Sequence, residues 1–184
     1  RPELLFGNWI AKDQRMRIFF YGFKPYADYS SNITEQVLAR IDETQMLKKR
    51  VFDVRFDAAM FNETLARIKP DRIIGLGQHP RARKLRIERK AKNLQQSAGK
   101  APAPIIAGGS RESYVTLTLP QNELTTVTYD AGTYVCNYSM YLMAQYCRQT
   151  GAQSGFVHIP VEYDLRTLRQ YLHQAVQQIV HSNR

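Results

Sequence analysis

The chain has 184 residues, a length that suits one folded domain with a substantial core. Its 43% hydrophobic and 23% charged content is typical of globular proteins, and no apolar run approaches the roughly 20 residues that cross a bilayer. The composition therefore excludes a membrane-spanning helix, while the formal net charge of +10 raises the question of a nucleic-acid partner.

The first half of the chain alternates strand and helix patterns. Residues 17–23 form a β-rich run that ends in a turn, and the apolar spacing after Asn32 is helical, with Asn32 as a plausible cap. A later helix pattern stops at Pro70, and the pattern over 84–93 alternates like an edge strand. In chain order we predict strands over 17–23, 48–56, 71–77 and 84–93, and helices over 33–41 and 57–68.

The second half contains one segment of low order and then further strands and helices. Residues 94–113, rich in Gly, Pro, Ala and Ser, are too short to separate domains, and we predict a long loop there. Strands alternating with helices predict an α/β sandwich with helices on both faces of one sheet. We expect residues 1–184 to form a single domain, with 1–15 as an N-terminal extension. The remaining predicted elements are strands over 114–120, 124–132 and 154–162, a helix that begins near Cys136, and an amphipathic helix over 164–182.

Three ionisable residues suggest a catalytic site. In α/β sheets, functional groups gather at the carboxyl ends of strands, where Cys136, His158 and Glu88 could meet. A helix N-terminus and a neighbouring imidazolium both favour the thiolate of Cys136. His158 would take the thiol proton and deliver it to a leaving amine, Glu88 would orient the imidazole, and backbone amides near Cys136 could form an oxyanion hole.

Each of these residues also has an ordinary structural interpretation. A cysteine in a helix beside aromatic residues, such as Cys136, is more often part of a core. A histidine in an apolar strand, such as His158, is more often a hydrogen-bonded core residue. Glu88 lies among basic residues, and such a glutamate is more often a surface ion-pair partner. Spacing alone leaves open whether the three side chains meet.

The cysteines and histidines give no sign of disulfide or metal chemistry. Cys136 and Cys147 lie eleven residues apart in one predicted helix, about 16 Å along its axis, so they cannot bridge without disrupting it. We therefore interpret both as thiols and expect a cytoplasmic protein. The four His and two Cys show no metal-ligand spacing, so we expect no metal and no cofactor.

The positive charge is concentrated in one part of the chain. Between Arg67 and Lys100, eleven Lys and Arg accompany two acidic residues, and the rest of the chain is almost neutral. The centre of this excess is the basic segment, residues 81–92. Such a run can bind phosphates, but it is more often a solvated strand, a loop or a subunit face. No nucleic-acid-binding motif accompanies it, so we do not expect a nucleic-acid partner.

From Arg17 to about Val161 the chain resembles the cysteine-type pyroglutamyl peptidases, also called pyrrolidone-carboxylate peptidases. The resemblance implies a three-layer α/β/α sandwich with a central mixed sheet. The last two of its motifs are the most specific. The matching segments are YGFKPYADYSSN (21–32), PDRIIGLGQ (70–78), IERKAKN (87–93), YDAGTYVCNYSMY (129–141) and GFVHIP (155–160).

The resemblance implies a thiol-dependent hydrolase that removes N-terminal pyroglutamate from peptides through a Cys-His-Glu triad. Cys136 matches the family's nucleophile, His158 its base and Glu88 the third member. The substrate would be a peptide or a related small lactam or amide, and self-association into a homo-oligomer is plausible. By position, the aromatic residues that contact the pyroglutamyl ring would be Phe23, Tyr26 and Tyr134, with Gln78 as a lactam-binding residue. Phe23 could instead be core, and Gln78 a strand-end hydrogen-bonding residue.

Two departures from the family pattern affect the loops around the pocket. The family's Gly-Gly is Ala27-Asp28 here, and a turn with positive φ tolerates alanine poorly, so we expect that loop to take another path. The family's helix before the strand that precedes the cysteine motif is largely deleted. These changes predict a trimmed enzyme with an altered substrate range.

A third departure replaces the family's Ala-Gly-Gly-Arg with HPRA at residues 79–82. Pro80 fixes φ and removes an amide, so any backbone contact to substrate there has changed. Arg81 or Arg83 could replace the missing arginine, although the offset differs for both. The alternative to an enzyme is a non-peptidase relative that binds a ligand or partner through the basic segment.

Overall fold

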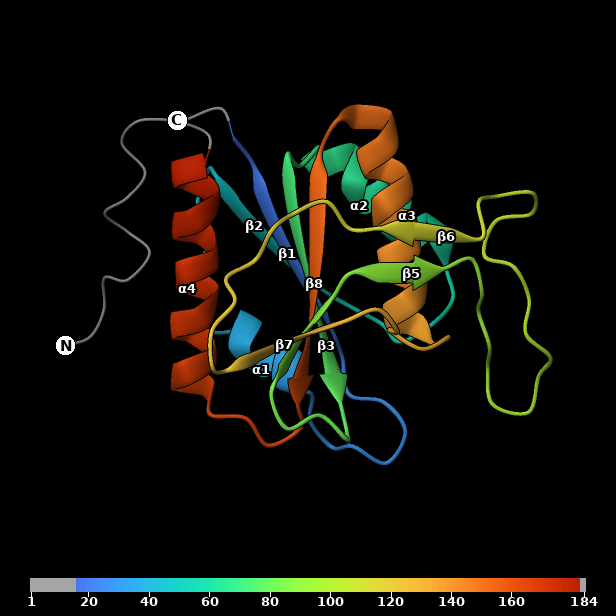
Figure 1. The fold of residues 1–184 in the computed structure, drawn as a ribbon, viewed down its shortest axis with the longest axis horizontal. Helices are drawn as coiled ribbons and strands as arrows, with labels where there is room; N and C mark the ends of the chain where they lie inside the picture. Colours follow the sequence, from blue (N-terminus) through green and yellow to red (C-terminus); the bar gives the residue numbers. More distant parts are fainter. Residues whose placement is uncertain (1–15, 183–184) are drawn as a thin grey trace.

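A computed structural model describes residues 16–182, so the predicted N-terminal extension at 1–15 lies outside the described residues. Four helices flank a six-stranded sheet with the order β2-β1-β3-β8-β4-β7, and β5 and β6 form a separate two-stranded sheet (Figure 1). The strands are β1 (Ile18–Phe23), β2 (Leu47–Phe52), β3 (Arg72–His79), β4 (Leu85–Glu88), β5 (Lys90–Lys92), β6 (Glu112–Tyr114), β7 (Thr125–Thr128) and β8 (Gln153–Pro160). The helices are α1 (Ile33–Leu38), α2 (Ala58–Ile68), α3 (Val135–Thr150) and α4 (Leu165–Ser182).

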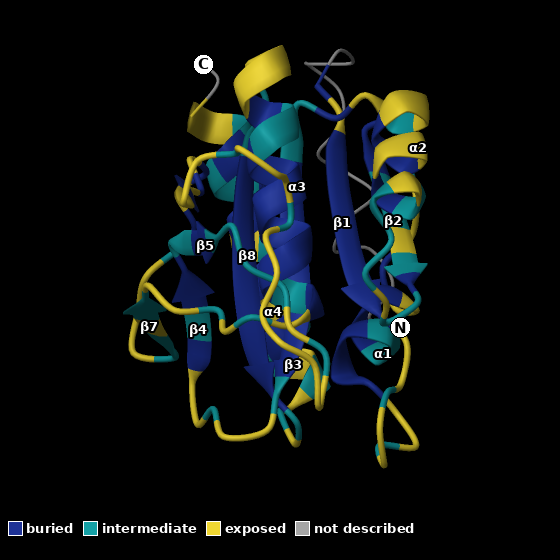
Figure 2. Cartoon of the chain, turned by 90° about the vertical axis from the view of Figure 1, so that its right-hand side faces the viewer, coloured by how far each residue is buried: buried dark blue, intermediate teal, exposed yellow. Residues whose placement is uncertain are grey.

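The predicted sandwich is confirmed, with α1 and α4 on one face of the sheet and α2 and α3 on the other. Successive residues of a strand point to opposite faces, and β1 follows this rule. Its residues Ile18 and Phe20 join the core under α1 and α4, whereas Phe19 and Tyr21 join the core under α2 and α3. Because both faces are covered, β1 is buried along its whole length, as its dark blue colour in Figure 2 shows.

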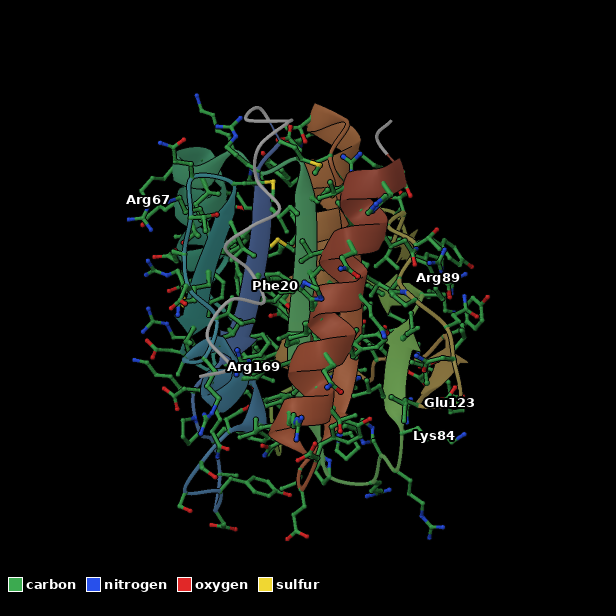
Figure 3. All side chains as sticks on the ribbon, turned by 90° about the vertical axis from the view of Figure 1, so that its left-hand side faces the viewer. Phe20, Arg67, Lys84, Arg89, Glu123 and Arg169 are labelled. Carbon is green, nitrogen blue, oxygen red and sulfur yellow. The ribbon has the colours of Figure 1, made fainter. Side chains whose placement is uncertain are left out.

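The helix ends and outer faces follow from local sequence. Asn32 caps α1, because its side-chain oxygen accepts a hydrogen bond from the amide of Thr34 at 3.0 Å. Charged side chains such as Arg67, Lys84 and Glu123 project outward, while Phe20 lies between the sheet and α4 (Figure 3). In the described part of the chain we find no helix with the length and hydropathy that a membrane crossing requires.

The sheet is mixed, and this decides how the site is built. Strands β2, β1, β3 and β8 run parallel to one another, whereas β4 is antiparallel to β8 and parallel to β7. The expectation of an edge-like strand over 84–93 is wrong, because β4 is paired on both sides and β7 forms the edge. The run also breaks at Arg89, after which β5 leaves the sheet and pairs with β6.

The strand predicted over 114–120 is also largely absent. Only β6, which ends at Tyr114, is a regular strand in this region. Val115, Leu117 and Leu119 are nevertheless buried alternately, and the amide of Leu117 donates to the carbonyl of Ser154 at 2.9 Å. The alternating sequence pattern therefore indicates an extended segment with one buried face. It does not indicate that the segment forms a full ladder of backbone hydrogen bonds.

Candidate functional site

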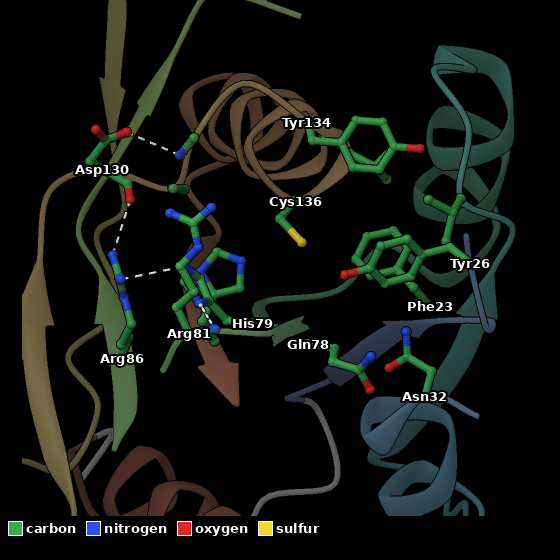
Figure 4. Close-up of a pocket in the computed structure, with 15 residues that line it drawn as sticks. Phe23, Tyr26, Asn32, Gln78, His79, Arg81, Arg86, Asp130, Tyr134 and Cys136 are labelled. Atoms are coloured by element: carbon green, nitrogen blue, oxygen red, sulfur yellow. Dashed lines mark hydrogen bonds between the residues drawn. The ribbon is translucent and has the colours of Figure 1, made fainter. Parts of the chain in front are cut away.

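A pocket of about 450 Å³ opens where the ends of β1 and β3 meet the N-terminus of α3. Every predicted site residue lines it except Glu88, which lies behind His158. Figure 4 shows aromatic side chains on one side of Cys136 and a group of basic side chains on the other. The lining residues are Phe23, Tyr26, Asn32, Val54, Gln78, His79, Arg81, Arg86, Asp130, Ala131, Gly132, Tyr134, Val135, Cys136 and His158.

Cys136 lies in the first turn of α3, as the sequence predicted. Tyr134 is the N-cap residue, and its side chain makes no capping hydrogen bond. The first amides of a helix have no partner within the helix, so those of Val135 and Cys136 are available at its positive end. The hydroxyl of Ser139 donates to the carbonyl of Cys136 at 2.8 Å and ties down this first turn. The thiol therefore lies at the positive end of the helix, beside amides that have no partner within it.

His158 and Glu88 form a buried pair. The Nδ1 atom of His158 lies 2.8 Å from Oε1 of Glu88, and the side chains are 4% and 0% exposed. In the antiparallel pairing of β4 with β8, Arg86 lies opposite His158 and Glu88 lies opposite Phe156. Glu88 therefore reaches His158 diagonally across the two strands, on the same face of the sheet.

The strand that carries Glu88 does not run in the direction we expected. His158 and Cys136 do lie near the carboxyl ends of the parallel strands, but β4 runs the opposite way. Glu88 therefore comes from a strand with the reverse direction, and not from a neighbouring carboxyl end. The interpretation of Glu88 as a surface ion-pair partner is also wrong, because its side chain is fully buried.

The electrostatics of the pair favour a charged imidazole. Burial is the largest influence on His158 and lowers its pKa. The negative charge of Cys136, a side-chain hydrogen bond to Cys136 and the contact with Glu88 together outweigh burial and raise the pKa to about 9. With Nδ1 on Glu88, Nε2 is the ring nitrogen left for the thiol. At neutral pH the ring therefore holds both protons and faces Cys136.

Glu88 has two further partners that the sequence did not indicate. Arg86 places its Nε atom 3.1 Å from Oε1 of Glu88, and the hydroxyl of Thr128 donates to Oε2. Arg86 also approaches His79 at 3.4 Å and donates to the carbonyl of Asp130 at 3.3 Å. A buried carboxylate needs such partners to remain ionised. Glu88 is held in one orientation from three sides.

Gly77 is a residue that the sequence reasoning missed. A Cβ atom at this position would lie 2.7 Å from Sγ of Cys136, 2.8 Å from Cδ2 of His158 and 2.9 Å from Cζ of Phe156. The thiol and the imidazole thus meet directly above the backbone of Gly77. The only sequence signal was the glycine at the end of an apolar strand, which is where a backbone often approaches other groups closely.

Aromatic residues form one wall of the pocket. The rings of Tyr26 and Tyr134 lie 6.3 Å apart, and Phe23 is 3% exposed while also lining the pocket. Phe23 is therefore both a core residue and a pocket residue. Burial, followed by the charge of Cys136, raises the pKa of Tyr26 to about 12, so this ring stays neutral. Ala27 next to it has φ of +50°, so this loop contains a left-handed residue although that residue is alanine.

Only one of the two polar atoms in the Gln78 side chain has a hydrogen-bond partner among the described residues. Its Oε1 atom accepts a hydrogen bond from the amide of Ile33 at 3.0 Å, at the N-terminus of α1. Its Nε2 atom is buried and has no hydrogen-bond partner among the described residues. Gln78 is thus a strand-end hydrogen-bonding residue, as the alternative held, and it also presents an unused donor in the pocket lining.

The HPRA segment forms a tight turn at the pocket mouth. The amide of Ala82 donates to the carbonyl of His79 at 3.2 Å, and the amide of Arg81 donates to Nδ1 of the same histidine at 3.2 Å. The rings of His79 and His158 are 5.1 Å apart. Burial, then the charges of His158 and Arg86, lower the pKa of His79. Arg81 lines the pocket and Arg83 does not.

Three of the seven cations in the basic segment pair with acidic side chains of the protein. Arg86 pairs with Glu88, Lys90 pairs with Glu112 at 2.8 Å and Lys92 pairs with Asp130 at 2.9 Å. These pairs leave fewer cations available to phosphates than the sequence suggested. Within residues 16–182, no group of three or more His, Cys, Asp or Glu side chains is arranged to hold a metal ion.

Comparison with known proteins gives consistent matches. The model of the family described as pyroglutamyl peptidase matches residues 16–103 and 116–170. A pyrrolidone-carboxylate peptidase from Thermococcus litoralis is 29% identical over 172 residues, which covers 80% of this chain and 78% of that protein. Another from Pyrococcus furiosus is 30% identical over 168 residues, covering 79% of this chain and 81% of that protein.

Solved structures agree on the fold. The structure of the pyrrolidone carboxyl peptidase from Thermococcus litoralis has a TM-score of 0.83 at 24% identity, and covers 92% of this chain and 96% of that one. A mutant of the Pyrococcus furiosus enzyme has a TM-score of 0.80 at 23% identity, with 91% and 99% covered. The gap in the family match, residues 104–115, contains β6 and the irregular residues just before it.

Proposed function

This chain belongs to the pyroglutamyl peptidase family and is a cysteine peptidase of that type, and from this premise we propose that it removes N-terminal pyroglutamate from peptides with Cys136 as the nucleophile. The observation that carries the assignment of residues is the series of contacts from the buried Glu88 through His158 to Cys136 in the pocket lining. Such a series supplies a nucleophile, a proton carrier and a group that orients the carrier.

The first half of the proposed reaction forms an acyl-enzyme. The Cys136 thiolate attacks the carbonyl carbon that joins pyroglutamate to the next residue, and the oxygen becomes negatively charged. The amides at the start of α3 stabilise this charge, because they point toward it from the positive end of the helix. His158 donates its proton to the leaving amine, the carbon–nitrogen bond breaks, and a thioester remains on Cys136.

The second half returns the enzyme to its starting state. Neutral His158 accepts a proton from water, whose oxygen attacks the thioester carbon. The carbon–sulfur bond then breaks, pyroglutamate leaves, and the thiolate and imidazolium are restored. Glu88 is also bound by Arg86 and Thr128, and it keeps the imidazole ring in one orientation throughout.

The aromatic wall accounts for recognition of the lactam. Pyroglutamate is a flat, neutral ring, and the side chains of Phe23, Tyr26 and Tyr134 offer an apolar surface of matching shape. The unused Nε2 donor of Gln78 would bind the lactam carbonyl, which also satisfies a buried polar atom. A free α-amine is charged, and its desolvation in this pocket would be costly, so ordinary peptide N-termini are disfavoured.

The test is hydrolysis of a fluorogenic pyroglutamyl amide in the presence of a reductant. We expect turnover by the wild-type protein and by Cys147→Ala, and none by Cys136→Ala. Cys147 is a matched control, because it lies in the same helix, is 7% exposed, and its pKa is raised by burial. Equal turnover by Cys136→Ala and wild type would refute the assignment of the nucleophile. Absence of turnover by the wild-type protein would refute the proposed substrate.

A further inference from the structure

Arg81 is the one charged side chain lining the pocket that has no charged partner among the described residues. Glu88 is paired with Arg86, and Asp130 is paired with Lys92. The imidazole of His158 lies 2.8 Å from Glu88. The guanidinium of Arg81 lines the pocket and has no hydrogen-bonded or ionic partner among the described residues. One positive charge is therefore left without a counter-ion at the pocket mouth.

Arg81 lies on the side from which the leaving group departs. The leaving amine takes its proton from His158, so the residue that follows pyroglutamate must lie beside that ring. The His158 ring is 5.1 Å from the ring of His79, whose Nδ1 accepts the amide of Arg81. The aromatic residues that would hold the lactam are on the opposite side of Cys136 (Figure 4). A substrate bound in this direction brings its second residue toward Arg81.

The turn that carries Arg81 is held in place. Its two hydrogen bonds to His79 hold the backbone at Arg81 and Ala82, and Pro80 fixes one backbone dihedral. The turn thus fixes the point at which the Arg81 side chain leaves the backbone, at the edge of the pocket. A guanidinium binds carboxylates through two parallel hydrogen bonds, which makes it well suited to recognise one.

We propose that Arg81 selects substrates that carry a carboxylate on the residue immediately after pyroglutamate. This inference rests on the proposed function and adds the substrate class to it. The carboxylate has two possible sources: the free α-carboxylate of a pyroglutamyl dipeptide, or an acidic side chain in a longer peptide. Both place the same negative charge within reach of one exposed guanidinium.

Four peptides separate the two sources. Pyroglutamyl-alanine and pyroglutamyl-alanine amide differ only in the α-carboxylate. Pyroglutamyl-glutamate amide and pyroglutamyl-glutamine amide differ only in the side-chain charge. For the wild-type protein we expect kcat/KM to be about three- to fivefold higher for the acid of at least one pair, the range set by a partly exposed ion pair. The preference should shrink as salt is added.

The variants identify the residue responsible. Arg81→Gln should remove the preference, so that the acid and the neutral peptide of each pair are hydrolysed with the same kcat/KM, whereas Arg81→Lys should keep part of the preference. Arg83→Gln is the matched control, because Arg83 is exposed on the same turn and does not line the pocket. It should keep the full preference.

The experiment distinguishes failure of the inference about Arg81 from failure of the proposed peptidase activity. Hydrolysis of all four peptides without a preference for the acid in either pair would overturn the inference and leave the peptidase activity intact. A preference that survives in Arg81→Gln, or is lost in Arg83→Gln, would also overturn it. If no peptide is hydrolysed, both the inference and the proposed function fail.

Discussion

Replacement of Gly77 by alanine tests directly whether Cys136 and His158 act as a pair. The added Cβ would lie 2.7 Å from Sγ of Cys136, which is about 0.7 Å short of the 3.4 Å at which ordinary contact begins. It would also lie 2.9 Å from the fully buried ring of Phe156, which has no room to retreat. Because Glu88 holds the His158 ring, the thiol must move away from the imidazole.

A displacement of this size has a large effect on catalysis. A misplacement of about 1 Å in a catalytic group can reduce the rate 100-fold, so we expect kcat/KM of Gly77→Ala to fall on the order of 30- to 100-fold. Crowding in a packed core should also lower the free energy of unfolding by about 1–3 kcal/mol. The assay is hydrolysis of the fluorogenic pyroglutamyl amide, with urea unfolding measured on the same samples.

A matched control separates the effect on the site from the effect on stability. Gly155→Ala adds a methyl group to β8 on the opposite face of the sheet, where its Cβ would meet the side-chain tip of Leu119 at 3.1 Å. We expect a stability loss in this variant with little change in kcat/KM. A folded Gly77→Ala protein with kcat/KM near that of wild type would refute the inferred contact between the thiol and the imidazole.

Two further substitutions test the site and its support. In Glu88→Gln the loss of the negative charge should lower the pKa of His158 from about 9, so the alkaline limb of kcat/KM against pH should move to lower pH. An unchanged limb would contradict this, because the limb reports the loss of the imidazolium proton as pH rises. Asn137 is fully buried and binds both backbone groups of Lys92 and the carbonyl of Leu94, at 2.8–2.9 Å. Asn137→Ala should lower the free energy of unfolding in urea by about 2–4 kcal/mol, and a loss under about 1 kcal/mol would contradict the inferred role.

Much of the local structure was predictable from sequence. Helix and strand patterns depend on residues within a few positions of one another, and so do caps and turns. The placement of Cys136 in the first turn of a helix and of His158 in a buried strand followed from such patterns, as did the cap at Asn32. The resemblance to the peptidase family then supplied the grouping of Cys136, His158 and Glu88, which periodicity alone left open.

The patterns failed where an extended segment can satisfy its backbone in more than one way. The pattern over residues 84–93 predicted one edge strand, but β4 lies inside the six-stranded sheet and β5 belongs to the two-stranded sheet. Residues 114–120 alternate in burial without forming a regular strand. Alternation reports which side chains are buried, and it contains no information on which strands are neighbours or in which direction they run.

By itself, then, the sequence determined the local elements and the kinds of chemical group that this protein presents. The tertiary structure alone decided how those groups meet. The reversed direction of β4 brings Glu88 diagonally to His158, and Gly77 leaves the space in which the thiol and imidazole meet. In the pocket lining, the tertiary structure also left the Nε2 atom of Gln78 and the guanidinium of Arg81 without partners among residues 16–182. The physical reason is that these contacts join residues far apart in the chain, and their geometry depends on strand order, direction and register, which are set when the whole core packs.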